Sequence, residues 1–257
     1  MRDVHTADGV RLAVDAIGSG DPLLLLAGQG SSHAMWGPVR HRLAEHHRVV
    51  VFDYRGTGAS EVATGGYSTC GFAADAVAVL DAFDIPVAHV YGFSMGGRVA
   101  QWLAIDHPGR VGALVLGATS PGDRHGVPRP PDVEARFAEG GDFTDWLFSP
   151  EFRRARLRTD VQHDWRAGTS PRARARHYAA SQEHDTWDRL GEIAAPTLLL
   201  HGTEDVVNMT DNSRLLAERI PDARVALIEG ARHGYFEEFA EEAETTVLEF
   251  LAAHPLG

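Results

Sequence analysis

The chain has 257 residues, of which 44% are hydrophobic and 23% charged, as is typical of a globular protein with a sizeable core. Its formal net charge is −12. An acidic surface repels nucleic acid and anionic membrane, so neither is expected as a partner.

The single cysteine, Cys70, excludes an internal disulfide, and we expect it to be a small buried apolar residue. The first residues, "MRDVHTADGVRL", contain no apolar core of signal-peptide length, and every apolar run is too short to span a bilayer, so we expect a cytoplasmic location.

The first 120 residues alternate strand and helix patterns. Short apolar runs predict strands, and apolar residues at helical spacing predict the helices between them. The expected strands are 22–28, 47–53, 87–92 and 111–118, and the expected helices lie near 38–46 and over 69–83 and 96–107. Strands separated by helices of this length favour a mostly parallel sheet covered by helices on both faces, which is an α/β fold.

The alternation stops after residue 120. Residues 121–190 contain no strong strand pattern, but a proline cluster and short polar helix-like pieces. The alternation then resumes with strands over 195–202 and 223–230 and helices over 212–220 and about 238–252. We therefore predict an α/β core formed by 1–120 and 191–257, with a helical cap, or lid, inserted at 121–190.

The stretch "VYGFSMGGRVAQ" places G-x-S-x-G between a predicted strand and a predicted helix. A sharp strand-to-helix turn pushes its central side chain, here Ser94, out of the chain and crowds the positions two residues away. Glycine at 92 and 96 relieves that crowding. The turn also points the backbone N–H of Met95, at a helix N-terminus, toward the target of the serine. The pattern predicts an exposed serine nucleophile.

A serine nucleophile needs a base and an orienting carboxylate. The chain has fourteen histidines, so position must choose among them. His233 follows the last predicted strand and Asp205 follows the preceding one, at the strand ends where parallel-sheet proteins place their chemistry. The order Ser94, Asp205, His233 is that of an α/β-hydrolase triad. Glu204, beside Asp205, is the alternative acid.

Several segments together resemble the α/β-hydrolase fold family of serine hydrolases. They are "FDYRGTGASE", "GFSMGGRVAQ", "HGTEDVV" and "GARHGYFEE". The segment around Ser94 is most similar to 3-oxoadipate enol-lactonases and their esterase-like relatives. The resemblance implies a hydrolase that cleaves a small carboxylic ester or lactone, with no metal or organic cofactor. It favours Asp205 over Glu204 as the acid. It also implies a second oxyanion donor, the backbone N–H of Gln29, beside that of Met95.

Fold alone does not determine chemistry, so two other functions stay open. One is a non-hydrolytic, or a carbon–carbon bond-cleaving or cyclising, biosynthetic enzyme, and the other is a catalytically silent ligand-binding protein. The histidines and glutamate of "HRLAEHH" (41–47) lack zinc-protease spacing, and we expect them at a solvated helix end, so no metal site is predicted. The expected partner is a small-molecule substrate, and the oligomeric state stays open.

The cap contains three of the five tryptophans, Trp146, Trp165 and Trp187. They either line a substrate pocket or attach the cap to the core. The cap also has 12 arginines and 12 acidic residues, so its formal charge is zero. An arginine that reaches inward could hold a substrate carboxylate, although the spacing of "RRARLR" and "RARAR" turns most of them to solvent.

Overall fold

The computed structural model describes residues 1–139, 143–156, 165–166 and 168–257. Within these residues, eight strands form a sheet in the order β1-β2-β4-β3-β5-β6-β7-β8. The strands are β1 Arg2–His5, β2 Arg11–Ile17, β3 Pro22–Leu26, β4 Arg48–Phe52, β5 Ala88–Phe93, β6 Val111–Gly117, β7 Thr197–Gly202 and β8 Ala223–Ile228. Strand β2 is antiparallel to both of its neighbours and the remaining pairs are parallel. The predicted mostly parallel sheet is confirmed.

The first two strands were not predicted. Strand β1 exposes three of its four side chains, and Arg2 and Asp3 give it a polar sequence. In β2, Leu12 and Val14 are buried in the core. The residue between them, Ala13, is also apolar and buried, so the strand shows no clear alternation of apolar and polar residues. Neither strand therefore shows the continuous apolar run that marks the buried parallel strands of this chain. Together they extend the sheet by an antiparallel hairpin at one edge.

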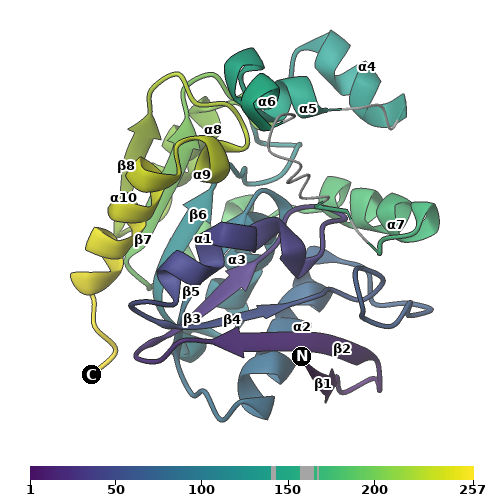
Figure 1. Ribbon diagram of the computed structural model, residues 1–257, viewed down its shortest axis with the longest axis vertical. Coiled ribbons are helices and arrows are strands. Elements are labelled where there is room, and N and C mark those ends of the chain that lie inside the picture. The colour runs from purple at the N-terminus through teal and green to yellow at the C-terminus, as the bar shows by residue number, and fades with distance from the viewer. Residues whose placement is uncertain (140–142, 157–164, 167) are drawn as a thin grey trace.

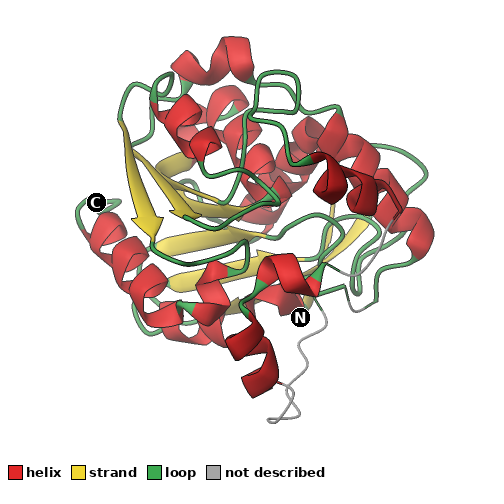
Figure 2. Ribbon diagram, turned by 90° about the horizontal axis from the view of Figure 1, so that it is seen from above, coloured by secondary structure: helices red, strands yellow, loops and turns green. Residues whose placement is uncertain are grey.

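Helices lie on both faces of the sheet (Figure 2). Those of the core are α1 Gly37–Leu43, α2 Thr69–Ala82, α3 Met95–Asp106, α8 Asp211–Ala217, α9 Tyr235–Glu238 and α10 Ala240–Ala252, with 3-10 turns at η1 His33–Trp36, η2 Pro108–Arg110 and η3 Trp187–Glu192. The last predicted helix corresponds to α10, and the single turn α9 before it was not predicted; Phe239 separates the two, because its ψ of 43° leaves helical geometry. Helix α2 packs on α3, and α1 on α10.

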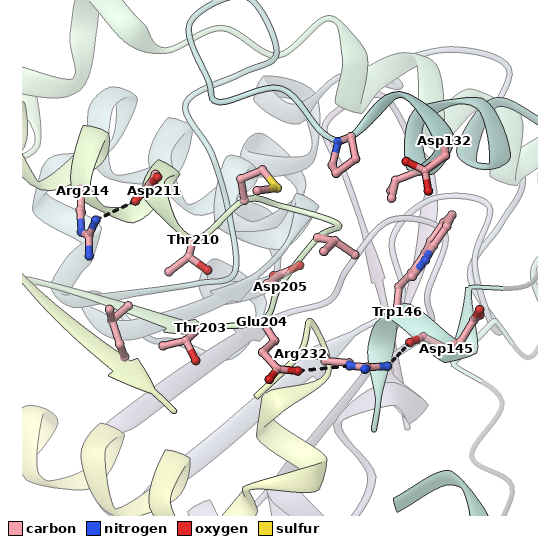
Figure 3. Close-up of a pocket in the computed structure, with 15 residues that line it drawn as sticks. Asp132, Asp145, Trp146, Thr203, Glu204, Asp205, Thr210, Asp211, Arg214 and Arg232 are labelled. Carbon is pink, nitrogen blue, oxygen red and sulfur yellow. Dashed lines mark hydrogen bonds and ion pairs between the residues drawn. The ribbon is translucent and has the colours of Figure 1, made fainter. Parts of the chain in front are cut away.

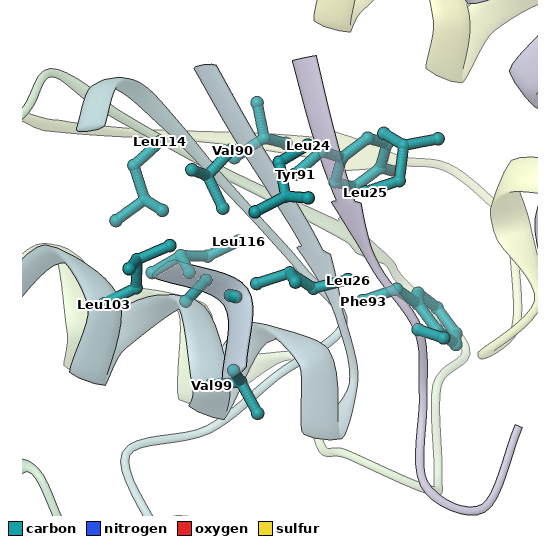
Figure 4. Packing of buried hydrophobic residues seen from close by; sticks show 14 of the residues in the cluster. Leu24, Leu25, Leu26, Val90, Tyr91, Phe93, Val99, Leu103, Leu114 and Leu116 are labelled. Atoms are coloured by element: carbon teal, nitrogen blue, oxygen red, sulfur yellow. The ribbon is translucent and has the colours of Figure 1, made fainter. Parts of the chain in front are cut away.

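The centre of the core is a tight apolar layer between the middle strands and α3 (Figure 4). Leu26 of β3, Val90 of β5 and Leu116 of β6 are fully buried, as are Val99 and Leu103 of α3. Interiors packed in this way resist deformation. The turn from β5 into α3, which carries Ser94, is therefore held from both sides.

The segment between β6 and β7 contains α4 Pro131–Glu139, α5 Thr144–Leu147, α6 Pro150–Arg156 and α7 Pro171–Gln182. Figure 1 shows α4, α5 and α6 above the carboxyl ends of β6 and β8. Arg98 of α3, only 2% exposed, joins this segment to the core. Its guanidinium donates to Ser120 and Ser181 and forms a 2.7 Å ion pair with Asp123. The exact division into core and cap stays a prediction.

Two expectations about single residues are wrong. Cys70 is exposed, because it lies on the outer side of α2, where its Sγ is 3.6 Å from Asp106 Oδ2. His47 is buried rather than solvated, because it begins the turn into β4 and its Nδ1 lies 3.2 Å from the Asp21 carbonyl oxygen. Among the described helices, none combines the length and the apolar character needed to cross a membrane.

Candidate active site

Ser94 occupies the strained turn between β5 and α3. Its φ of 56° and ψ of −118° lie outside the regions that non-glycine residues normally adopt. Three hydrogen bonds hold the turn in place. The Ser94 N–H donates to the Gly117 carbonyl over 2.8 Å, and the Ser94 carbonyl accepts from the Thr119 hydroxyl at 2.7 Å and from the Gly97 N–H at 2.9 Å. Strain held by its surroundings is typical of functional sites.

The glycines around Ser94 lie where no side chain fits. A Cβ built on Gly92 would lie 2.2 Å from the carbonyl oxygen of Gly96. A Cβ on Gly97 would lie 2.6 Å from the Cβ of Thr119, the residue that holds the serine carbonyl. The glycines around Ser94 are therefore required by close approach of the backbone.

Asp205 and His233 meet at the carboxyl ends of β7 and β8. The Nδ1 of His233 lies 2.7 Å from Oδ2 of Asp205, and both side chains are buried. The other carboxylate oxygen, Oδ1, accepts from the backbone N–H groups of Val207 at 2.8 Å and Asn208 at 3.0 Å. The structure therefore brings together the two residues that the sequence predicted as acid and base.

The electrostatics of this pair favour a charged carboxylate. Burial acts to raise the pKa of Asp205, but the neighbouring charge of His233 and the hydrogen bonds from His201 and His233 outweigh it. The net result is a pKa well below the ordinary value of an aspartate. An ionised Asp205 can hold the imidazole of His233 in one tautomer, with the proton on Nδ1 and Nε2 free to act as a base.

Ser94 is linked to this pair through Phe93. The ring centroids of Phe93 and His233 are 4.8 Å apart, so the turn and the histidine loop are direct neighbours. Between the described residues no hydrogen bond joins the Ser94 hydroxyl to His233. Catalytic hydrogen bonds are commonly loose before a substrate binds, so the serine–histidine link stays a prediction.

The two expected oxyanion donors lie on the loop after β3 and at the start of α3. Gly28, which precedes Gln29, packs against the turn, because a Cβ on Gly28 would lie 3.7 Å from the Cβ of Ser94. Met95 is the first residue of α3, where N–H groups have no acceptor within the helix. This placement is compatible with the predicted roles of both N–H groups, and no described contact tests them.

The three cap tryptophans lie in different surroundings. Trp165 stacks on Phe236 with centroids 5.3 Å apart and meets the edge of Phe93 at 6.0 Å, beside the serine turn. Trp187 stacks instead on His125, with Arg219 on its ring at 3.8 Å. Both tryptophans pack against the hydrophobic core, as the second alternative for the cap tryptophans expects.

Trp146 belongs to an open groove of about 720 Å³ between α4, α5 and the loop after β7 (Figure 3). Asp205 also contributes to this groove, so the groove lies on the side of the acid loop. Glu204, the alternative acid, points toward Arg232, whose Nε is 3.7 Å from its Oε2. The two neighbouring acids therefore have different partners: Asp205 contacts His233, whereas Glu204 faces Arg232.

The cap also contacts the histidine loop directly. The backbone N–H of Gly234 donates to the carbonyl of Leu147 over 2.8 Å, and that of His233 donates to the carbonyl of Trp146 over 3.4 Å. Arg232 donates to the carbonyl of Asp145 at 2.6 Å. The end of helix α5 therefore helps to fix the position of the loop that carries His233.

Sequence reasoning missed one side chain of this site, His201. It lies on β7, is fully buried, and contacts Asp205. The available signal was a histidine inside the apolar run "TLLLHG", four residues before the acid, since a buried polar group on a parallel strand needs a partner. Among the described residues, no group of three potential metal ligands comes together.

Comparison with known proteins agrees with this geometry. The family model described as alpha/beta hydrolase fold matches residues 21–240. The chain belongs to the α/β-hydrolase fold family. It is 30% identical to a protein of Caulobacter sp. named for carbamate hydrolysis, over 90% of each chain. It is 28% identical to 3-oxoadipate enol-lactonase 2 of Acinetobacter baylyi, also over 90% of each chain.

A solved structure gives the same result. Est816, described as an N-acyl homoserine lactone degrading enzyme, superposes on this chain with a TM-score of 0.84. The two are 30% identical, and the alignment covers 97% of this chain and 100% of the other. The predicted fold class and the predicted family are confirmed, and the family and these relatives support a hydrolase.

Proposed function

We propose that this α/β hydrolase cleaves a small carboxylic ester or lactone through an acyl-enzyme on Ser94. The observation that carries the proposal is the 2.7 Å hydrogen bond between Asp205 and His233, in a loop whose ring contacts join it to the strained Ser94 turn. A serine on such a turn, beside a buried carboxylate–imidazole pair, has the parts that nucleophilic acyl transfer requires. The lactone-degrading relatives support this substrate class.

The reaction follows from the orientation of the imidazole. Because Nδ1 of His233 is engaged by Asp205, Nε2 takes the proton of Ser94 as its Oγ attacks the substrate carbonyl. The oxyanion that forms accepts from the backbone N–H groups of Gln29 and Met95. His233 then returns the proton to the departing alkoxide, which leaves an ester on Ser94.

The second half repeats these steps with water. His233 removes a proton from a water molecule, the resulting hydroxide attacks the acyl carbon, and the proton returns to Ser94 as the acid leaves. With a lactone, the alkoxide and the acyl group belong to one molecule, so the product is a hydroxy acid. Residues of this chain perform every step.

The aromatic side chains beside the turn support an apolar substrate group. The rings of Phe93, Trp165 and Phe236 contact one another, with Phe93 next to the nucleophile. Phe93 and Phe236 are buried, so of these three rings only the half-buried Trp165 can offer apolar surface to a substrate. We therefore expect an apolar acyl or alcohol portion in the substrate.

Kinetics on a panel of short aryl esters and lactones tests the proposal, with mass analysis after treatment with a fluorophosphonate. We expect turnover, one phosphonate adduct on Ser94, and a loss of about 10⁶-fold in kcat in Ser94→Ala. Turnover within tenfold of the parent in that variant would contradict the acyl-enzyme. A preference for carbamates, or a product from carbon–carbon cleavage, would keep the site and replace the substrate class. An unlabelled Ser94 with no turnover would favour a binding protein.

A further inference from the structure

His201 is a buried imidazole that the proposed reaction does not consume. It lies on β7, four residues before Asp205, and its side chain is fully buried. Its neighbours along the strand, Leu198, Leu199 and Leu200, are apolar. A polar ring in such a place needs hydrogen-bond partners to offset its lost hydration.

The partners of His201 determine its tautomer. Nε2 lies 2.7 Å from the carbonyl oxygen of Asn208 and 3.1 Å from Oδ2 of Asp205, and both of these atoms only accept. Nε2 therefore carries a proton and shares it between the two acceptors. Nδ1 lies 2.7 Å from Oγ of Ser213, on α8, whose hydroxyl can donate to the bare nitrogen. The result is a chain of hydrogen bonds, Ser213–His201–Asp205–His233.

The carboxylate of Asp205 is saturated by this arrangement. Oδ1 accepts two backbone N–H groups, from Val207 and Asn208. Oδ2 accepts from His233 at 2.7 Å and from His201 at 3.1 Å. Four donors in fixed directions leave the carboxylate one orientation, the one that faces His233.

We propose that His201 is a positioning residue, which is held by Ser213 and fixes the Asp205 carboxylate against His233. The inference rests on the proposed roles of Asp205 and His233. The other titratable groups around the carboxylate are Tyr235 of α9, which is fully buried, and Glu204, which faces Arg232.

The role predicts a particular change in pH dependence. Without His201, Oδ2 of Asp205 accepts one hydrogen bond fewer. Its negative charge then attracts the His233 imidazolium more strongly. The acidic limb of kcat/KM against pH should therefore move up. We expect a shift of about half a pH unit to one unit, together with a fall of about tenfold in kcat.

Matched variants separate this role from a purely structural one. His201→Leu removes both nitrogens at similar volume, whereas the amide of His201→Gln can place an N–H near the position of Nε2. Ser213→Ala leaves the ring and removes its anchor. His89→Leu, on β5, is the control, because that histidine is also buried but neither of its nitrogens has a hydrogen-bond partner among the described residues.

We expect the limb to move in His201→Leu, to return toward the parent position in His201→Gln, and to stay in place in His89→Leu. An unmoved limb in His201→Leu, with equal losses in His201→Gln, would overturn the proposal. It would leave His201 as an anchor of the loop at Asn208. If His201→Leu does not fold, Ser213→Ala takes its place. The acidic limb of Ser213→Ala is then compared with those of His201→Gln and the parent, and an unmoved limb in Ser213→Ala would overturn the proposal.

Nitrogen-15 NMR of the histidine-labelled parent tests the same arrangement without any substrate. We expect His201 to carry its proton on Nε2, and the Nδ1–H signal of His233 to move in His201→Leu and to move less in His201→Gln. A proton on Nδ1 of His201 would overturn the hydrogen-bond chain. Because this measurement needs no turnover, it gives its answer even if the ester and lactone panel fails.

Discussion

The backbones of Gly96 and Leu26 approach each other closely where the serine turn meets strand β3. A Cβ built on Gly96 would lie 2.1 Å from the carbonyl oxygen of Leu26 and 2.7 Å from that of Ala27. Both contacts are with backbone of the central sheet, which cannot move aside as a flexible side chain would. The close approach brings the start of α3 against the loop that carries Gln29.

Replacement of Gly96 should therefore disturb the fold and the site together. We expect Gly96→Ala to lower the free energy of unfolding by about 3 kcal/mol, since overpacking against backbone forces the turn to shift. Urea denaturation measures the change. Gly109→Ala is the control, because a Cβ there meets no atom within 4 Å, and it should stay within about 0.5 kcal/mol of the parent. Equal stabilities for the two variants would contradict the close approach of Gly96 to β3.

Asp205→Asn should cost far more activity than Glu204→Gln. An amide at 205 would keep its oxygen toward the N–H groups of Val207 and Asn208, and its NH₂ would then face His233. That contact favours the tautomer with Nδ1 bare and Nε2 protonated, which cannot accept the serine proton. We expect a loss of roughly 10⁴-fold in kcat.

Glu204 is the matched control for this pair. Its side chain is 58% exposed and faces Arg232 at 3.7 Å, an interaction that contributes little in water. Steady-state kinetics of Glu204→Gln should therefore stay within a few-fold of the parent. A larger loss in Glu204→Gln than in Asp205→Asn would transfer the role of triad acid to Glu204.

Stability should fall on mild acidification because of His177. Burial lowers the pKa of this histidine to about 4 from its ordinary 6.5, against the effect of a hydrogen bond to the Arg55 carbonyl. Between those two pH values the unfolded chain binds a proton that the folded chain does not. The contribution of the neutral His177 to the free energy of unfolding is therefore complete above pH 6.5. It is lost as the pH falls toward 4, by an amount of the order of 3 kcal/mol.

The measurement is the free energy of unfolding between pH 7.5 and 4.5. His177→Phe should reduce the slope, because phenylalanine can keep the stacking on Phe72, whose centroid lies 4.9 Å from that of His177, and cannot take up a proton. Some slope should remain, because burial also lowers the pKa of His47, His89 and His184. His41→Phe, at an exposed position of α1, should leave the slope unchanged. A parent and a His177→Phe variant with the same slope would rule out this histidine as the cause.

The sequence could predict Ser94, Asp205 and His233 as a set because each follows a strong apolar strand, and strand ends in a parallel sheet share one edge. It could not predict His201. A histidine within an apolar run has the same appearance in the sequence whether its nitrogens form hydrogen bonds or not. His89 on β5 is an example, because its nitrogens have no hydrogen-bond partner among the residues that the structure describes. Only the path of the loop after β7 brings Asn208 and Asp205 to its Nε2.

The cap was harder to predict for a related reason. Trp165 and Trp187 are both cap residues, yet one packs beside the serine turn and the other on Arg219. Short polar helices have no long apolar face, so periodicity does not specify which side meets the core. The surroundings of these side chains depend on contacts that are distant in sequence.

Arg174, on α7, is a cap arginine whose stem lies against the loop after β3. Its Cγ would be 3.4 Å from a Cβ built on Gly30, the residue after Gln29. Arg136, Arg156 and Arg189 form ion pairs with Asp145, Glu237 and Asp106. The guanidinium of Arg174 makes no hydrogen bond or ion pair with the described residues, and because its stem lies beside the loop that carries Gln29, we propose it as the partner of a substrate carboxylate.

A carboxylate on the substrate should therefore be recognised through Arg174. We expect the parent to prefer an ester or lactone with a free carboxylate over its neutral amide analogue by at least tenfold in kcat/KM. A charged hydrogen bond contributes about 1.5–3 kcal/mol, which corresponds to such a ratio. Arg174→Ala should remove the preference while Arg172→Ala, at an exposed position of the same helix, keeps it. High salt should reduce the preference in the parent. Equal rates for the anion and the amide in the parent would exclude an arginine clamp and leave the aromatic rings around Phe93 to select the substrate.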